Sequence, residues 1–85
     1  MIMEQEEVWQ IDSTLDTLGY FCPEPVVRTR TELKKMAVGE VLEVLADDPG
    51  SFRDIPRFTE RVGQQLLLAR QEDNYYRFII KKIID

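Results

Sequence analysis

The stretch CPEPVVRTRTELKKMAVGEVLEVLA, residues 22–46, decides the fold because it changes from a helical to a strand pattern. In its first part, side chains that can pack in a core recur every three or four positions, which predicts an amphipathic helix starting at Pro23. These side chains are Val26, Thr29, Leu33 and Met36. Gly39 is expected to end the helix. Residues 41–46 are mostly apolar and branched, which predicts a buried central strand.

Patterns on either side of this stretch predict further elements. An imperfect alternation of apolar and polar residues indicates a first strand over residues 11–18. A second helix is expected over residues 51–62, with Asp48 as a candidate N-cap. Because Pro56 cannot lie deep inside a regular helix, we expect the first turn of the helix before it and the main body of the helix after it.

Two last strands, over residues 65–71 and 75–83, give the order β-α-β-α-β-β. This order predicts the α/β (α+β) class, as a two-layer sandwich of a four-stranded mixed sheet with two helices on one face. Residues 1–10 are expected to be a mobile acidic N-terminal arm, and residues 11–85 one domain.

Size and composition indicate a globular chain with one modest core. The chain has 85 residues, of which 44% are hydrophobic and 32% charged, so a disordered chain is excluded. Its apolar runs are too short to cross a bilayer, and its acidic start does not resemble a secretory signal. We therefore expect a cytoplasmic monomer with no membrane attachment.

The chain contains one cysteine, Cys22, and no histidine. An internal disulfide, a Cys-His pair, a Ser-His-Asp triad and a histidine metal site are therefore excluded. The four glycines form no phosphate-binding loop. We expect neither a metal nor a bound cofactor, and whether the chain is itself an enzyme stays open.

Charge is distributed unevenly along the chain. The net charge is −5, yet residues 23–36 carry four basic and two acidic side chains. An acidic protein is a poor ligand for phosphates, so direct, high-affinity nucleic-acid binding is not expected. The basic side chains of residues 23–36 are either a solvated helix face or one docking surface for a protein partner.

The position of Cys22 favours a reactive thiol. A free cysteine is often a buried packing residue, but Cys22 lies outside the apolar stripe, directly before a proline-started helix. At or near the N-cap, its sulfur would face the positive end of the helix dipole, which predicts a lowered thiol pKa. Pro23 and Pro25 would hold the thiol exposed at the tip of the connection.

Two sequence blocks carry a resemblance to a known family. Residues 15–25, LDTLGYFCPEP, and residues 46–56, ADDPGSFRDIP, resemble the TusA/SirA sulfur-carrier family with its Cys-Pro-x-Pro motif. The similarity extends over about residues 14–82, and Cys-Pro-Glu-Pro together with the second block is most similar to the TusA members.

The resemblance implies a function for Cys22. In this family the motif cysteine accepts a sulfur as a persulfide from a cysteine desulfurase and passes it to a downstream sulfur-relay protein or another acceptor. For TusA members the route ends in 2-thiouridine at the tRNA wobble position, whereas relatives serve molybdenum-cofactor, sulfur-oxidation or selenium pathways. A binding or regulatory module without sulfur chemistry remains the alternative.

The remaining candidates would position the sulfur or bind a partner. Pro23, Glu24 and Pro25 are the expected positioning residues. The candidates for partner docking are Arg28, Arg30, Lys34, Asp48, Arg53 and Asp54. Asp48 and Asp54 also suit helix caps, and Arg53 either pairs with one of these carboxylates or guides the partner.

Overall fold

The computed structural model describes residues 9–85, so most of the proposed N-terminal arm lies outside the described residues. Trp9, the first described residue, is half-buried and lines a shallow hollow together with Val41 and Leu67.

Six elements follow one another in the expected order β-α-β-α-β-β. Their bounds are β1 Ser13–Thr17, α1 Glu24–Lys35, β2 Val41–Ala46, α2 Ser51–Arg61, β3 Gln65–Gln71 and β4 Tyr76–Lys81. The bounds of β2 and β3 agree with the prediction, whereas β1 and β4 are shorter than expected at both ends.

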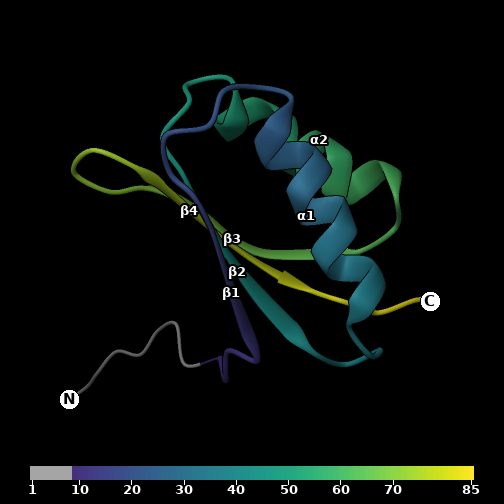
Figure 1. The fold of residues 1–85 in the computed structure, drawn as a ribbon. Helices are drawn as coiled ribbons and strands as arrows, with labels where there is room; N and C mark the ends of the chain where they lie inside the picture. Colours follow the sequence, from purple (N-terminus) through teal and green to yellow (C-terminus); the bar gives the residue numbers. More distant parts are fainter. Residues whose placement is uncertain (1–8) are drawn as a thin grey trace, which may run out of the picture.

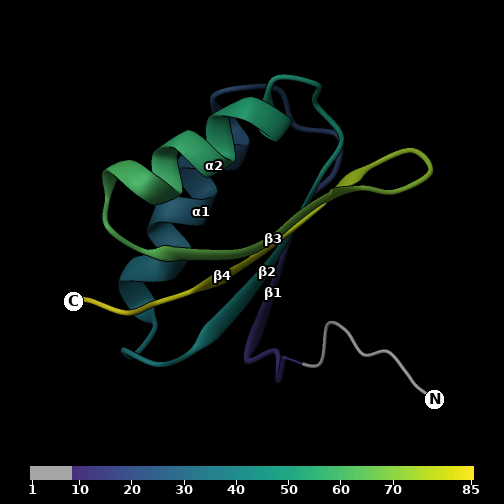
Figure 2. The same ribbon diagram turned by 180° about the vertical axis from the view of Figure 1, so that it is seen from behind.

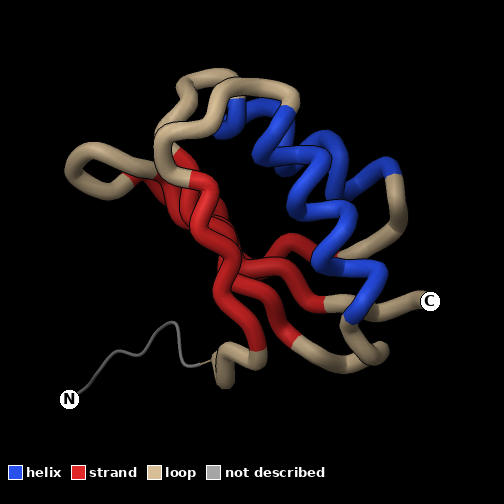
Figure 3. Tube along the Cα trace, viewed as in Figure 1, coloured by secondary structure: helices blue, strands red, loops and turns tan. Residues whose placement is uncertain are grey.

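The strands form one mixed sheet in the order β1-β2-β4-β3. β1 and β2 are parallel, and β4 is antiparallel to both of its neighbours, β2 and β3. Both helices lie against the same face of this sheet, which gives the predicted two-layer sandwich (Figures 2 and 3). The turn between β3 and β4 projects away from the helices (Figure 1).

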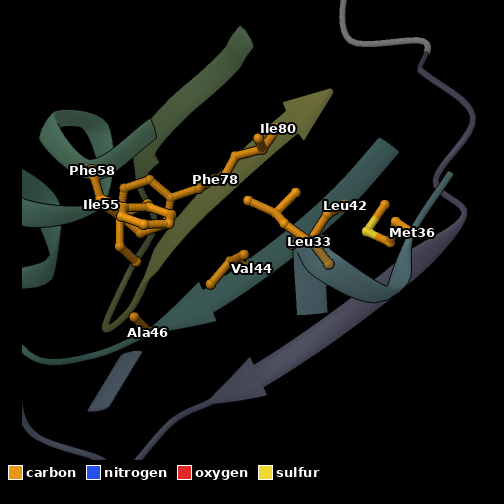
Figure 4. Close-up of a cluster of buried hydrophobic side chains, with 9 residues drawn as sticks. All are labelled: Leu33, Met36, Leu42, Val44, Ala46, Ile55, Phe58, Phe78 and Ile80. Carbon is orange, nitrogen blue, oxygen red and sulfur yellow. The ribbon is translucent and has the colours of Figure 1, made fainter. Parts of the chain in front are cut away.

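The core lies between the helices and the sheet. Leu33 and Met36 of the predicted stripe on α1 are buried, and Val26 packs against the core from a half-buried position. The α2 helix contributes Ile55 and Phe58 (Figure 4). The sheet contributes Leu42, Val44, Ala46, Phe78 and Ile80. The predicted core face of the first helix is therefore confirmed.

The end of α1 differs from the expectation. The helix ends at Lys35, and Gly39, with φ of 100°, lies in the following turn rather than at the helix end. The ammonium of Lys82 is buried here and donates hydrogen bonds of 2.8 Å to the carbonyls of Leu33 and Met36. A cation suits this place because the last carbonyls of a helix are unpaired and partially negative.

The α2 helix is continuous through Pro56, which is the sixth of its eleven residues and so lies deeper in the helix than expected. Only the bond that an N–H at position 56 would donate to Phe52 is lost, and the rest of the helix is kept by burial of its apolar face. The N-cap is Gly50, and no side chain caps the helix. Asp48 instead accepts the N–H of Gly50 at 3.1 Å, within the turn that precedes α2.

Candidate functional site

Cys22 lies where two connections meet. The parallel strands β1 and β2 end at the same edge of the sheet, so the connections to α1 and α2 lie side by side (Figure 1). Both carboxylate oxygens of Asp47, after β2, accept the N–H of Gly19, after β1, at 3.0 and 3.2 Å. Gly19 has φ of 88°, a conformation that glycine adopts without strain. This contact ties the loop that carries Cys22 to the start of α2.

The Cys22 side chain is exposed and points to α2. Its Sγ lies 3.0 Å from Oδ2 of Asp54, to which the thiol donates a hydrogen bond. The other oxygen of this carboxylate, Oδ1, accepts a hydrogen bond from Nε of Arg53 at 3.2 Å. Asp54 therefore joins the sulfur to a positively charged side chain, and it is not the helix cap that the sequence suggested.

The electrostatics of this contact reverse the expected thiol acidity. The hydrogen bond to the Asp54 carboxylate raises the pKa of Cys22, and the negative charge of Asp48 acts in the same direction. The pKa of Asp54 is lowered, first by the hydrogen bond from Cys22 and then by the one from Arg53. The thiol is therefore protonated at neutral pH, and the prediction of a lowered pKa is wrong.

The local geometry explains this error. The N-cap of α1 is Pro23, so Cys22 lies one residue before the cap, and α1 has no side-chain cap. The N–H of Glu24 donates to the carbonyl of Phe21 at 2.9 Å, which closes a turn around the cysteine. The peptide bond between Cys22 and Pro23 is cis. The thiol donates its hydrogen bond to a carboxylate of the second helix, and no hydrogen bond from the first turn of α1 to its sulfur is present among the described residues.

The three expected positioning residues have different surroundings. Pro23 is exposed beside the sulfur, whereas Pro25 is buried and its carbonyl accepts the hydroxyl of Thr29 at 2.7 Å. Glu24 is exposed and pairs with Arg28, with 3.0 Å between Oε1 and Nε. Pro25 thus anchors the first turn of α1 in the protein interior.

The docking candidates lie at two places in the structure. Asp48, Arg53 and Asp54 surround the thiol, and Arg28 lies over the ring of Tyr20, with its guanidinium carbon 4.1 Å from the ring centroid. Arg30 and Lys34 instead line a separate hollow between the helices and the C-terminal segment. Arg28 and Arg30 point in different directions because residues two apart lie on opposite sides of a helix.

Two arginines that were not predicted as site residues lie at the hollow beside the sulfur. Arg57 and Arg61 of α2 line a hollow of about 270 Å³ together with Cys22, Pro23, Val26 and Asp54. Their four-residue spacing places both on one face of α2, and Asp54 precedes Arg57 by three residues. This spacing was the available signal, but only the folded chain shows that the face meets Cys22.

Other classes of site are not indicated between residues 9 and 85. This part of the chain has no group of three or more metal-ligating side chains. None of its helices has the length and apolar character needed to cross a membrane.

Comparisons with known proteins show the family of this chain. The family model described as sulfurtransferase TusA matches residues 13–82. The chain belongs to the TusA family. It is 43% identical over 68 residues to the "Putative sulfur carrier protein" of Archaeoglobus fulgidus, covering 79% of this chain and 88% of that one. The crystal structure of a SirA-like protein from Desulfitobacterium hafniense matches with a TM-score of 0.75 and 28% identity, covering 85% and 99% of the two chains.

Within this TusA family member, the contact between Cys22 and Asp54 gives a direct prediction. Asp54→Asn removes the negative charge that favours the protonated thiol, so the pKa of Cys22 should fall. At neutral pH a larger thiolate fraction should then react faster with iodoacetamide. The measurement is the alkylation rate of the unloaded protein from pH 6 to pH 10.

Asp73→Asn is the matched control, because it removes the same charge from the exposed turn between β3 and β4. It should leave the alkylation profile of Cys22 unchanged. An Asp54→Asn profile that coincides with the wild-type profile would show that Asp54 does not control the thiol.

Proposed function

We propose that this chain carries one sulfur atom as a persulfide on Cys22. A cysteine desulfurase donates the sulfur, and an acceptor protein takes it onward for the synthesis of 2-thiouridine at the tRNA wobble position. The single observation that carries the proposal is the exposed thiol of Cys22, held at the meeting point of two connections within the Cys-Pro-Glu-Pro motif. The sequence has no second cysteine and no histidine, so this thiol is the candidate nucleophile.

The transfer step balances without an oxidant. The Cys22 thiolate attacks the terminal sulfur of a donor persulfide, R–S–S–H. A new bond forms between Sγ and the transferred sulfur, the donor S–S bond breaks, and the donor leaves as the thiolate R–S⁻. The transferred sulfur keeps its proton or loses it to solvent. Delivery to an acceptor thiolate repeats the exchange, with the Cys22 thiolate as the leaving group.

The contact with Asp54 must be broken before this reaction. A protonated thiol is a poor nucleophile, so the raised pKa of Cys22 slows its reaction with electrophiles in solution. We propose that a docked donor replaces the hydrogen bond between Cys22 and Asp54 and so releases the thiolate at the interface. This would restrict sulfur uptake to the complex with the donor, in a reducing compartment such as the cytoplasm.

The experiment that tests carriage is incubation of the purified protein with a cysteine desulfurase and free cysteine. Intact mass measurement should show a gain of one sulfur atom, which a reductant removes. A protein that gains no mass, or gains mass that a reductant leaves in place, is not a persulfide carrier.

The acceptor is tested separately, in cells that lack this protein. The tRNA of these cells should lose wobble 2-thiouridine, and the wild-type protein should restore it. If the deficient cells contain the normal amount of 2-thiouridine, this protein does not supply that modification. Its sulfur then serves another pathway, such as molybdenum-cofactor synthesis, sulfur oxidation or selenium metabolism.

The surface around the thiol is the proposed docking site for the donor. Phe21, next to the thiol in sequence, is 77% exposed, and Phe52 at the start of α2 is 40% exposed. Arg28 adds positive charge where it lies over the ring of Tyr20, two residues before Cys22, and Asp48 and Arg53 lie close enough for their charges to act on the thiol. Exposed apolar side chains with charged neighbours are typical of a surface that binds another protein.

Arg28→Glu is expected to slow association with the desulfurase by roughly 3- to 10-fold. The reversed charge acts on the encounter of the two proteins, and the wild-type rate should fall with rising salt because exposed charges are screened. Stopped-flow kinetics at two salt concentrations measure both effects.

Lys35→Glu is the matched control for this prediction. It makes the same reversal at the last residue of α1, seven residues and about 10 Å further along the helix. Equal rates for Arg28→Glu and the wild-type protein, or equal slowing by both variants, would show that docking does not depend on the charge beside Cys22.

A further inference from the structure

The hollow beside Cys22 is lined by two arginines, whereas the unloaded thiol forms its hydrogen bond with Asp54. Pro23 and Val26 line it from the start of α1, and Arg57 and Arg61 line it from α2. At about 270 Å³ the hollow has ample room for one more sulfur atom, bonded to Sγ at about 2.0 Å. Cys22 lines the hollow and is exposed, so a group on Sγ can enter it.

Two positively charged side chains line this hollow, and the charge of one of them, Arg57, also helps to lower the pKa of Asp54. Arg57 and Arg61 are exposed, and neither forms an ion pair with any residue between 9 and 85. The carboxylate of Asp54, which lies at the same hollow, is already paired with Arg53. The lining of the hollow holds two arginines against one carboxylate, so an anion that extends into it from Sγ meets net positive charge, whereas Sγ itself lies against Asp54.

Loading the cysteine changes which partner its sulfur prefers. The unloaded thiol donates its proton to Asp54, but Sγ of a persulfide is bonded to the second sulfur and has no proton to donate. The terminal S–H of a persulfide is more acidic than a thiol, because the S–H bond is weaker and the neighbouring sulfur withdraws charge. The loaded group is therefore an anion at neutral pH, which Asp54 repels and a guanidinium attracts.

We propose that this hollow is the binding site for the terminal sulfur of loaded Cys22, in its anionic form, with Arg57 and Arg61 as the residues that hold it. The inference rests on the proposed persulfide chemistry and adds the site that receives the sulfur. In the unloaded protein the sulfur contacts Asp54; in the loaded protein the terminal sulfur lies against the two arginines. Loading thus exchanges a hydrogen bond with a carboxylate for an ionic contact with guanidinium groups.

The test loads the protein chemically, with inorganic polysulfide, so that it does not depend on a desulfurase. The double variant Arg57→Gln, Arg61→Gln is compared with the wild-type protein. Alkylation of the persulfide by iodoacetamide is followed by intact mass from pH 4 to pH 9, and the pH midpoint of the rate is determined. Both proteins are also measured unloaded, to report the thiol of Cys22 itself.

We expect the persulfide midpoint of the double variant to lie higher by roughly half a pH unit or more, because two charges that stabilise the anion are absent. High salt should move the wild-type midpoint toward that of the variant. The midpoint of the unloaded thiol should move less, because that thiol contacts Asp54. A purely structural role of the arginines would not separate the loaded from the unloaded protein in this way.

Arg30→Gln, Lys34→Gln is the matched control, since it removes two charges four residues apart from an exposed helix face at the other hollow. An unchanged persulfide midpoint in the Arg57, Arg61 variant, an equal shift in the control, or failure of the wild-type protein to hold a persulfide overturns the inference. If the desulfurase does not load the protein but the chemical midpoint shifts as expected, the carrier function fails and the sulfur site stands.

Discussion

Replacing Cys22 with serine is expected to abolish sulfur loading completely while leaving the fold intact. A serine hydroxyl is almost entirely protonated at neutral pH and cannot attack a donor persulfide without an activating base. The chain has no other cysteine to take over the role. The hydroxyl can still donate to the carboxylate of Asp54, so the contact between residue 22 and α2 is retained.

The measurement is the intact mass of the Cys22→Ser variant after incubation with desulfurase and cysteine, beside the wild-type protein. Thermal unfolding of the two proteins provides the control for the fold, and the curves should nearly coincide. A variant that gains the same reductant-sensitive mass as the wild-type protein would remove Cys22 from the proposed chemistry.

Phe78→Ala is expected to produce the largest loss of stability, about 3–5 kcal/mol. Phe78 lies in β4 and is fully buried among the core side chains drawn in Figure 4. Its ring also lies 6.3 Å from that of Phe52, between centroids. Truncation removes the buried ring and leaves a cavity that the surrounding helix and strands cannot fill. In a small protein this is a large part of the total free energy of unfolding.

Urea unfolding followed by circular dichroism measures this loss. Phe21→Ala is the matched control, because it makes the same truncation at a side chain that is 77% exposed, and it should change stability by about 0.5 kcal/mol or less. A cost for Phe78→Ala as small as that for Phe21→Ala would contradict the position of the core between the sheet and the helices.

Much of the fold could be predicted because each helix and strand has a recognisable pattern of side chains within its own stretch of sequence. The spacing of Leu33 and Met36 is helical, and the branched run of β2 is that of a buried strand. Pro56 lies deeper in its helix than expected because a single lost hydrogen bond is offset by burial of the neighbouring Ile55 and Phe58. Local propensity is overridden where the apolar face of a helix is well packed.

The candidate site was predicted in part. Cys22 was singled out from its motif, and the structure confirms that it is exposed. Its acidity was predicted with the wrong sign, because a neighbouring helix end was considered and Asp54, 32 residues further along the chain, was not. Arg57 and Arg61 were missed for the same reason, since nothing near them in sequence indicates that their helix face meets the sulfur.

The sequence by itself determined the order of the elements, the core face of α1 and the exposed cysteine before a proline-started helix, because each follows from side chains a few residues apart. Only the tertiary structure decided that β4 lies between β2 and β3 and that both connections meet at Cys22. It also decided that a carboxylate, not a helix N-terminus, sets the pKa of the thiol. The physical reason is that hydrogen bonds and charges act over a few ångströms of space, and chain folding alone brings distant residues that close.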